Sequence, residues 1–209
     1  MKRPKKFVEL GEITASYRWP RKGDRLLRAS NDRNKGVEFS ADPVSKHVHI
    51  WSGYIRAGAA LIEECDQDSV DRHFLIYPIL FNYRHGLELA MKWIIDRYGR
   101  YADVCLKEAE RDHDLWCLWK CCKQVIVGVG SEGKDDEALL VVEQIVKDFH
   151  DLDNSAMAFR YSTNKKGVTI KLPDTSVDLE NVRDVMEAVD NFFTGADGQL
   201  DANSSAVDW

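Results

Sequence analysis

The architecture follows from one stretch of the chain, Leu75-Ile-Tyr-Pro-Ile-Leu-Phe-Asn-Tyr-Arg-His-Gly-Leu-Glu-Leu-Ala-Met-Lys-Trp-Ile-Ile95. Its apolar residues recur every three or four positions, which is the period of an α-helix. They cover too much of the circumference for a helix with one solvated face. We therefore predict a helix over residues 69–98 that lies at the centre of a helical bundle.

Shorter stretches with the same period surround this helix. A single stretch, residues 167–172, instead alternates apolar and polar side chains, as strands do, and would pair with residues 159–162 across a turn. The predicted fold class is mainly α, a bundle of four to five helices with a small β-hairpin and an irregular N-terminal arm. The remaining helices are expected at residues 54–65, 115–127, 135–150 and 178–193.

Composition predicts one domain with two appendages. The 209 residues suffice for one sizeable core. Residues 1–50 lack helical periodicity and are expected to form a basic irregular arm, residues 51–194 the bundle, and residues 195–209 a flexible acidic tail. No stretch approaches the roughly 20 apolar residues of a membrane span, no secretory signal is visible, and the odd number of cysteines fits reduced thiols. We expect a cytoplasmic protein without a membrane partner.

The charges are divided unevenly along the chain. Residues 1–46 hold 12 Lys and Arg against 6 Asp and Glu, whereas the remaining residues hold 17 against 29. A basic arm can neutralise the phosphates of a nucleic acid. It can equally be a solvated extension, or dock on the acidic body of its own molecule. The sequence leaves these interpretations open.

The predicted central helix carries a polar stripe. Arg84, Glu88 and Lys92 are spaced four apart and share one face, with His85 beside them. Such a stripe can be a plain ion ladder on a solvated surface. Because the rest of this helix is apolar, the stripe can also be partly covered, and buried charges need partners. The sequence therefore marks these four residues as candidates for a site.

Two further motifs carry candidate residues. His113 is expected in the first turn of a helix, where the helix dipole favours a neutral imidazole that can act as a base. Cys117 and Cys121 follow at a spacing that invites a metal site, but residues eight apart on a helix lie about 12 Å apart and cannot share a tetrahedral ion. Arg160 and Tyr161 either cover the core or carry an anion to the polar stripe. We predict no metal, and the usual cofactor motifs are absent.

The order of these motifs resembles the HEPN family over about residues 54–193. The shared pieces are Tyr83-Arg-His-Gly-Leu-Glu-Leu-Ala-Met-Lys92, then His113-Asp-Leu-Trp-Cys-Leu-Trp119, then Phe159-Arg-Tyr161. The resemblance implies a four-to-five-helix bundle, often a homodimer, from prokaryotic toxin-antitoxin, phage-defence or nucleotidyltransferase-associated systems. Many members are metal-independent ribonucleases.

The chain departs from the family's ribonuclease signature, an arginine followed after four to six residues by a histidine. The nearest counterpart is Lys107, six residues before His113. Lysine cannot reproduce the planar, two-pronged contact of arginine with phosphate. The pair would then have to be assembled from other residues, or the chain does not cleave RNA.

The resemblance implies a protein that binds or cleaves RNA or a nucleotide. As an enzyme it would be a ribonuclease with His85 or His113 as base and acid, Arg84 or Arg160 on the phosphate, and Glu88 orienting a histidine or arginine. The substrate-binding candidates are Lys92, Arg160 and Tyr161. The alternative is a non-catalytic, dimerising module that recruits a protein or nucleic-acid partner. A third hypothesis is a sensor that holds an anionic small molecule inside the bundle.

Overall fold

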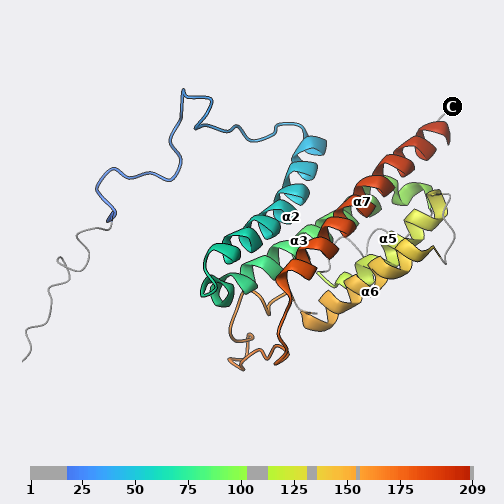
Figure 1. Ribbon diagram of the computed structural model, residues 1–209. Coiled ribbons are helices and arrows are strands. Elements are labelled where there is room, and N and C mark those ends of the chain that lie inside the picture. The colour runs from blue at the N-terminus through green and yellow to red at the C-terminus, as the bar shows by residue number, and fades with distance from the viewer. Residues whose placement is uncertain (1–17, 103–112, 131–135, 154–155, 208–209) are drawn as a thin grey trace, which may run out of the picture. The chain divides into compact units, whose positions relative to one another are not determined.

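The computed structural model describes residues 18–102, 113–130, 136–153 and 156–207 (Figure 1). The chain divides into two compact units, Met1–Phe39 and Ser40–Trp209. Residues 18–39 of the first unit contain turns and no helix or strand. In one of these turns the Arg21 N–H donates to the Asp24 carboxylate at 2.8 Å.

The second unit is helical, which confirms the mainly α prediction. Figure 1 shows α2 and α3 side by side, α5 beside α6, and α7 running along the bundle. Within the described ranges, none of the helices has the length and apolar character that crossing a membrane requires. The elements are α2 (Pro43–Gln67), α3 (Asp71–Tyr98), the short 3-10 helix η1 (Gly99–Tyr101), α5 (Leu115–Val129), α6 (Glu137–Leu152) and α7 (Leu179–Val207).

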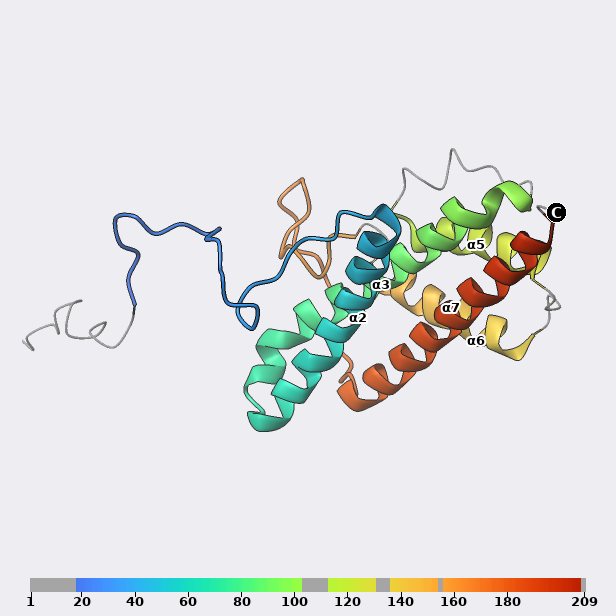
Figure 2. The same cartoon turned by 90° about the horizontal axis from the view of Figure 1, so that it is seen from above.

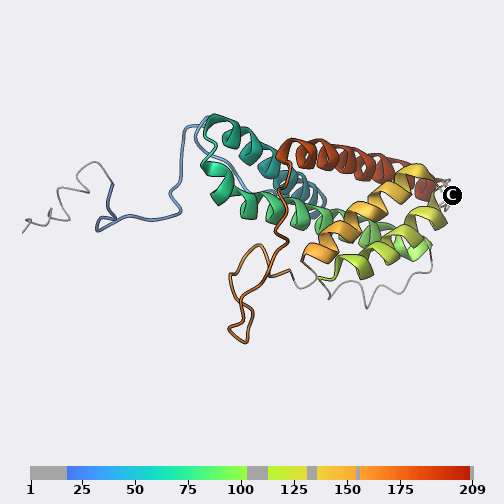
Figure 3. The same ribbon diagram turned by 60° about the horizontal axis from the view of Figure 1, so that its bottom comes forward.

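Helix α3 lies at the centre of the bundle. It packs against α2, α5 and α7, and the views in Figures 2 and 3 both show it beside α2. Its many buried side chains include Ile79, Leu87 and Ile94. The helix is continuous through Pro78. The wide apolar circumference of α3 is satisfied because helices cover it on several sides.

Two glycines let α2 and α3 approach closely. A Cβ atom at Gly58 would lie 2.8 Å from Cζ of Tyr83, and one at Gly86 would lie 2.6 Å from Cδ1 of Ile55. Tyr83 is fully buried, so its ring cannot move aside. Packing this tight needs a residue without a side chain on each helix.

Helix α2 begins at Pro43 and not near Tyr54, where the periodicity becomes regular. The Asp42 carboxylate caps it by accepting from the Ser45 N–H at 2.7 Å. Nε2 of His47 lies 3.1 Å from the Leu89 carbonyl oxygen of α3. These contacts stabilise the first turns of α2, which lie before the regular periodicity begins.

Helix α7 continues through most of the segment predicted to be a flexible tail. Ala196, Leu200 and Ser204 are buried at four-residue spacing. The Asp197 carboxylate accepts hydrogen bonds from Trp93 Nε1 and Tyr98 Oη of α3, each at 2.7 Å. This buried stripe is made partly of small and polar residues, so hydrophobic periodicity does not reveal it.

The predicted β-hairpin is wrong. In the described part of the chain the segment forms only an isolated antiparallel bridge between Thr163 and Thr169. The turn itself is present, and Gly167 adopts the positive φ of 75° that glycine tolerates. Val168 is exposed and Ile170 and Leu172 are only partly buried, so the apolar face is too weakly covered to stabilise a two-stranded ribbon in water.

We predict that Gly58→Ala lowers the free energy of unfolding by about 1 to 3 kcal/mol, because the added methyl group overlaps the immobile ring of Tyr83. Gly53→Ala is the matched control on α2. A Cβ there meets nothing within 4 Å, so the higher helix propensity of alanine should raise stability by up to about 1 kcal/mol. Urea unfolding followed by circular dichroism measures both. Equal stability of the two variants would contradict the close approach of α2 and α3.

Candidate functional site

The Glu88 side chain on α3 is the centre of a buried polar cluster. The residue is 1% exposed. Its Oε2 accepts from Nη1 of Arg84 at 3.1 Å, and its Oε1 accepts from Nζ of Lys92 and Nδ1 of His113, both at 2.8 Å. One carboxylate thus receives three donors. We call Arg84, Glu88, Lys92, His113 and Asp153 the Glu88 cluster.

Arg84 links three elements from inside the protein. Its Nη2 donates to the His113 carbonyl oxygen at 2.7 Å, and its Nε donates to the Asp153 carbonyl oxygen at 3.2 Å. His113 precedes α5, and Asp153 follows α6. At 2% exposure Arg84 offers no surface to a substrate phosphate. In this arrangement the guanidinium holds the chain at His113 and Asp153 against α3 and is covered from solvent.

The pKa of Glu88 determines which group donates in the hydrogen bond between Glu88 and His113. Burial opposes ionisation, but hydrogen bonds from Lys92 and His113 outweigh it and hold the pKa of this carboxyl below its ordinary value. Glu88 is therefore ionised at neutral pH and can only accept. A neutral His113 must then carry its proton on Nδ1, and Nε2 has an open lone pair.

His113 presents this lone pair at the surface. Its side chain is 67% exposed, and no residue in the described ranges forms a hydrogen bond with Nε2. His113 lies just before α5 and not in its first turn, because Asp114 is the cap and accepts from the Cys117 N–H at 2.9 Å. The cap and Arg84 together fix the backbone that carries the imidazole.

His85 lies outside the hydrogen-bonded cluster. Its ring packs edge-on against Tyr54, with centroids 4.5 Å apart, and parallel to Phe81 at 5.7 Å. Burial lowers the pKa of His85, and the nearby Glu88 charge opposes this effect without cancelling it. His85 is therefore neutral at pH 7.

Arg160 and Tyr161 reach the same helix from the loop after α6. The Arg160 guanidinium lies 5.8 Å from the ring centroid of Phe81 and 5.4 Å from that of Tyr161. Its Nε donates to the Ala156 carbonyl oxygen at 2.7 Å. Both residues are exposed. Tyr54, Phe81, His85, Arg160 and Tyr161 are thus linked by ring-ring and cation-ring contacts, and we call these five residues the aromatic band.

The structure thus divides the candidates predicted from sequence into two groups. Arg84, Glu88, Lys92 and His113 meet in the Glu88 cluster, whereas His85, Arg160 and Tyr161 lie in the aromatic band. Asp153 was not predicted because no motif marks it and it lies 69 residues from Arg84 in sequence. Lys107, the counterpart of the family's arginine, lies outside the described residues.

The three cysteines of α5 differ in exposure: Cys122 is buried, Cys121 is partly buried and Cys117 is exposed. Cys122 is fully buried, and burial raises the pKa of its thiol, so the thiol stays neutral. Across the residues with described positions, no three His, Cys, Asp or Glu side chains gather in a way that could hold a metal ion.

We predict that Glu88→Gln lowers the free energy of unfolding by about 3 kcal/mol or more, because it removes the nearer of the two carboxylates that pair with the buried Arg84. The control is Asp184→Asn, which breaks an exposed ion pair with Arg183 and should leave the urea midpoint nearly unchanged. Urea titrations of both variants check this. Similar midpoints for the two variants would show that the cluster does not hold the fold.

Comparison of the chain with protein-family models, curated proteins and solved structures finds no match. The resemblance to the HEPN family stays a prediction from the sequence. The features of the described residues that bear on function are the chemistry of the Glu88 cluster and the surface around it.

Proposed function

We propose that the chain binds RNA at the surface around His113 and cleaves it without a metal ion. A single observation carries the proposal: the exposed His113 imidazole is held at Nδ1, at 2.8 Å, by the buried and ionised carboxylate of Glu88. Such a carboxylate fixes the tautomer of the histidine and stabilises the imidazolium that forms when the histidine takes a proton. His113 is thus equipped for general acid-base catalysis.

RNA brings its own nucleophile, the 2′-hydroxyl, which DNA lacks. Nε2 of His113 takes the 2′-hydroxyl proton while the 2′-oxygen forms a bond to phosphorus. The bond from phosphorus to the 5′-oxygen breaks, and the imidazolium returns the proton to that oxygen. The products are a 2′,3′-cyclic phosphate and a 5′-hydroxyl, and Glu88 remains ionised throughout.

Neighbouring residues suit the rest of the substrate. Lys92 shares Oε1 of Glu88 with His113 and is partly exposed, so it can place a positive charge near the phosphate. The aromatic band offers exposed Tyr161 and Arg160 for stacking against bases. Phe81 and Glu88 are seven residues apart on α3, so the band and the cluster share one helix face about 10 Å apart.

Two features outside the cluster favour RNA as the substrate. The order of motifs resembles the HEPN family, which supports an RNA substrate and a prokaryotic toxin-antitoxin or phage-defence role. Residues 18–39 expose several cations, among them Arg21, Lys22 and Arg25, which would attract a polyanion.

A second candidate function is a non-catalytic module that binds a protein partner or a second copy. Val70, which precedes α3, and Phe74 and Tyr77 in its first turns expose apolar side chains. Exposed apolar groups that lie together favour burial against a partner. Under this alternative the Glu88 cluster would only stabilise the bundle.

We predict that the purified protein cleaves mixed single-stranded RNA in the presence of EDTA and leaves 2′,3′-cyclic phosphate ends. His113→Gln should reduce the rate by about a hundredfold or more, because the proton acceptor is lost. Its melting temperature should stay close to that of the wild type, since the side chain is largely exposed. Gel assays with end analysis and thermal unfolding measure these effects.

His73→Gln is the matched control, because His73 is an exposed histidine on α3 that lies outside the cluster and the aromatic band. It should retain the wild-type rate. If His113→Gln cleaves as fast as this control, His113 is not the acid-base residue. If the wild type leaves RNA intact and elutes as a dimer, the interaction module replaces the ribonuclease.

A further inference from the structure

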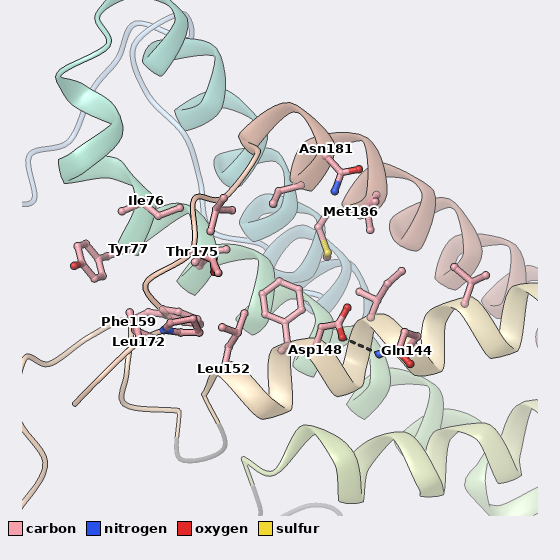
Figure 4. A pocket seen from close by; sticks show the side chains of 18 residues that line it. Ile76, Tyr77, Gln144, Asp148, Leu152, Phe159, Leu172, Thr175, Asn181 and Met186 are labelled. Carbon is pink, nitrogen blue, oxygen red and sulfur yellow. Dashed lines mark hydrogen bonds between the residues drawn. The ribbon is translucent and has the colours of Figure 1, made fainter.

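A cavity of about 640 Å³ lies between α3, α6, α7 and the segment that joins α6 to α7 (Figure 4). Residues other than those of the Glu88 cluster line it. Its volume falls within the roughly 300 to 1,000 Å³ of sites that hold drug-sized ligands. It is therefore large enough to be a second binding site.

The cavity has a buried apolar floor and an exposed apolar mouth. The floor includes Leu80, Phe149, Phe159 and Met186, all buried. The mouth includes Tyr77, Val141 and Val177, each about half exposed. Figure 4 shows Met186 and Leu152 reaching into the cavity from different helices. A ligand that fills this space would remove apolar surface from water, which is favourable.

The charge of the lining selects the kind of ligand. Among the lining residues, all of which are described, Asp148 is the one charged side chain, and its Oδ1 accepts from Nε2 of Gln144 at 2.8 Å. An anion would therefore meet a carboxylate and no cation. Gln144, Thr175 and Asn181 supply a small number of polar atoms that can pair with those of a ligand.

We propose that this cavity binds a neutral, largely apolar small molecule. Phe149 and Met186 line the cavity although both are buried. A small molecule inside the cavity can contact these side chains, whereas a flat protein surface cannot. The lining argues against the anionic ligand that the sequence suggested for the bundle interior. The site is independent of the ribonuclease proposal, since it shares no residue with the Glu88 cluster.

Nile red, a neutral apolar dye, tests the proposal by fluorescence titration. We expect saturable binding of one dye per chain with a Kd of about 10 µM. The anionic dye 8-anilinonaphthalene-1-sulfonate should bind at least about tenfold more weakly, because it meets Asp148. Val182→Trp places an indole in the cavity and should weaken Nile red binding by about tenfold or more, with circular dichroism reporting whether the fold is kept.

A second pair of variants decides the question even if Val182→Trp fails to fold. Val141 lines the mouth, whereas its neighbour Leu140 is about equally exposed on α6 and does not line the cavity. Val141→Lys should weaken Nile red binding by about tenfold, and Leu140→Lys should leave it unchanged. Equal binding by both variants would overturn the proposal. Binding confined to a dimeric fraction in size-exclusion chromatography would overturn it as well and assign the surface to a second copy.

Discussion

The buried contact between Arg84 and Glu88 is the interaction on which the rest of this bundle depends. Moving an ion out of water costs several kcal/mol, so buried charges must be paired and hydrogen-bonded. Here the pairing draws in the His113 backbone and side chain, Lys92, and the chain at Asp153. The start of α5 and the end of α6 are thereby fixed against the middle of α3.

The same contacts that fix the fold also create the candidate site. Arg84 is buried, and its guanidinium donates to the backbone carbonyl of His113, whose side chain is exposed. The buried carboxylate of Glu88 orients the imidazole of His113 through Nδ1. The buried ion pair that supports the site therefore lies beneath the exposed imidazole for which we propose the acid-base role. Such a division allows the imidazole to be altered without unfolding the protein.

Local features were predictable from the sequence, and features built by tertiary contacts were not. The ladder of Arg84, Glu88 and Lys92 follows from four-residue spacing on a helix whose apolar circumference is visible in the sequence. Asp153 joins the cluster only because α6 ends there in three dimensions. The last turns of α7 are helical because Asp197 bonds to α3, and the cavity arises from side chains of four separate segments. Hydrophobic periodicity along the sequence does not predict these contacts between distant segments.

The acid-base role that we propose for His113 requires a neutral imidazole that carries its proton on Nδ1, because Glu88 can only accept. Two-bond 1H–15N correlation spectra of uniformly 15N-labelled protein, recorded at alkaline pH and assigned with His113→Gln, distinguish the two tautomers directly. The account predicts a protonated Nδ1 and an unprotonated Nε2 on His113. A proton on Nε2 would contradict it, because Glu88 would then not hold the ring and no acceptor would face the solvent.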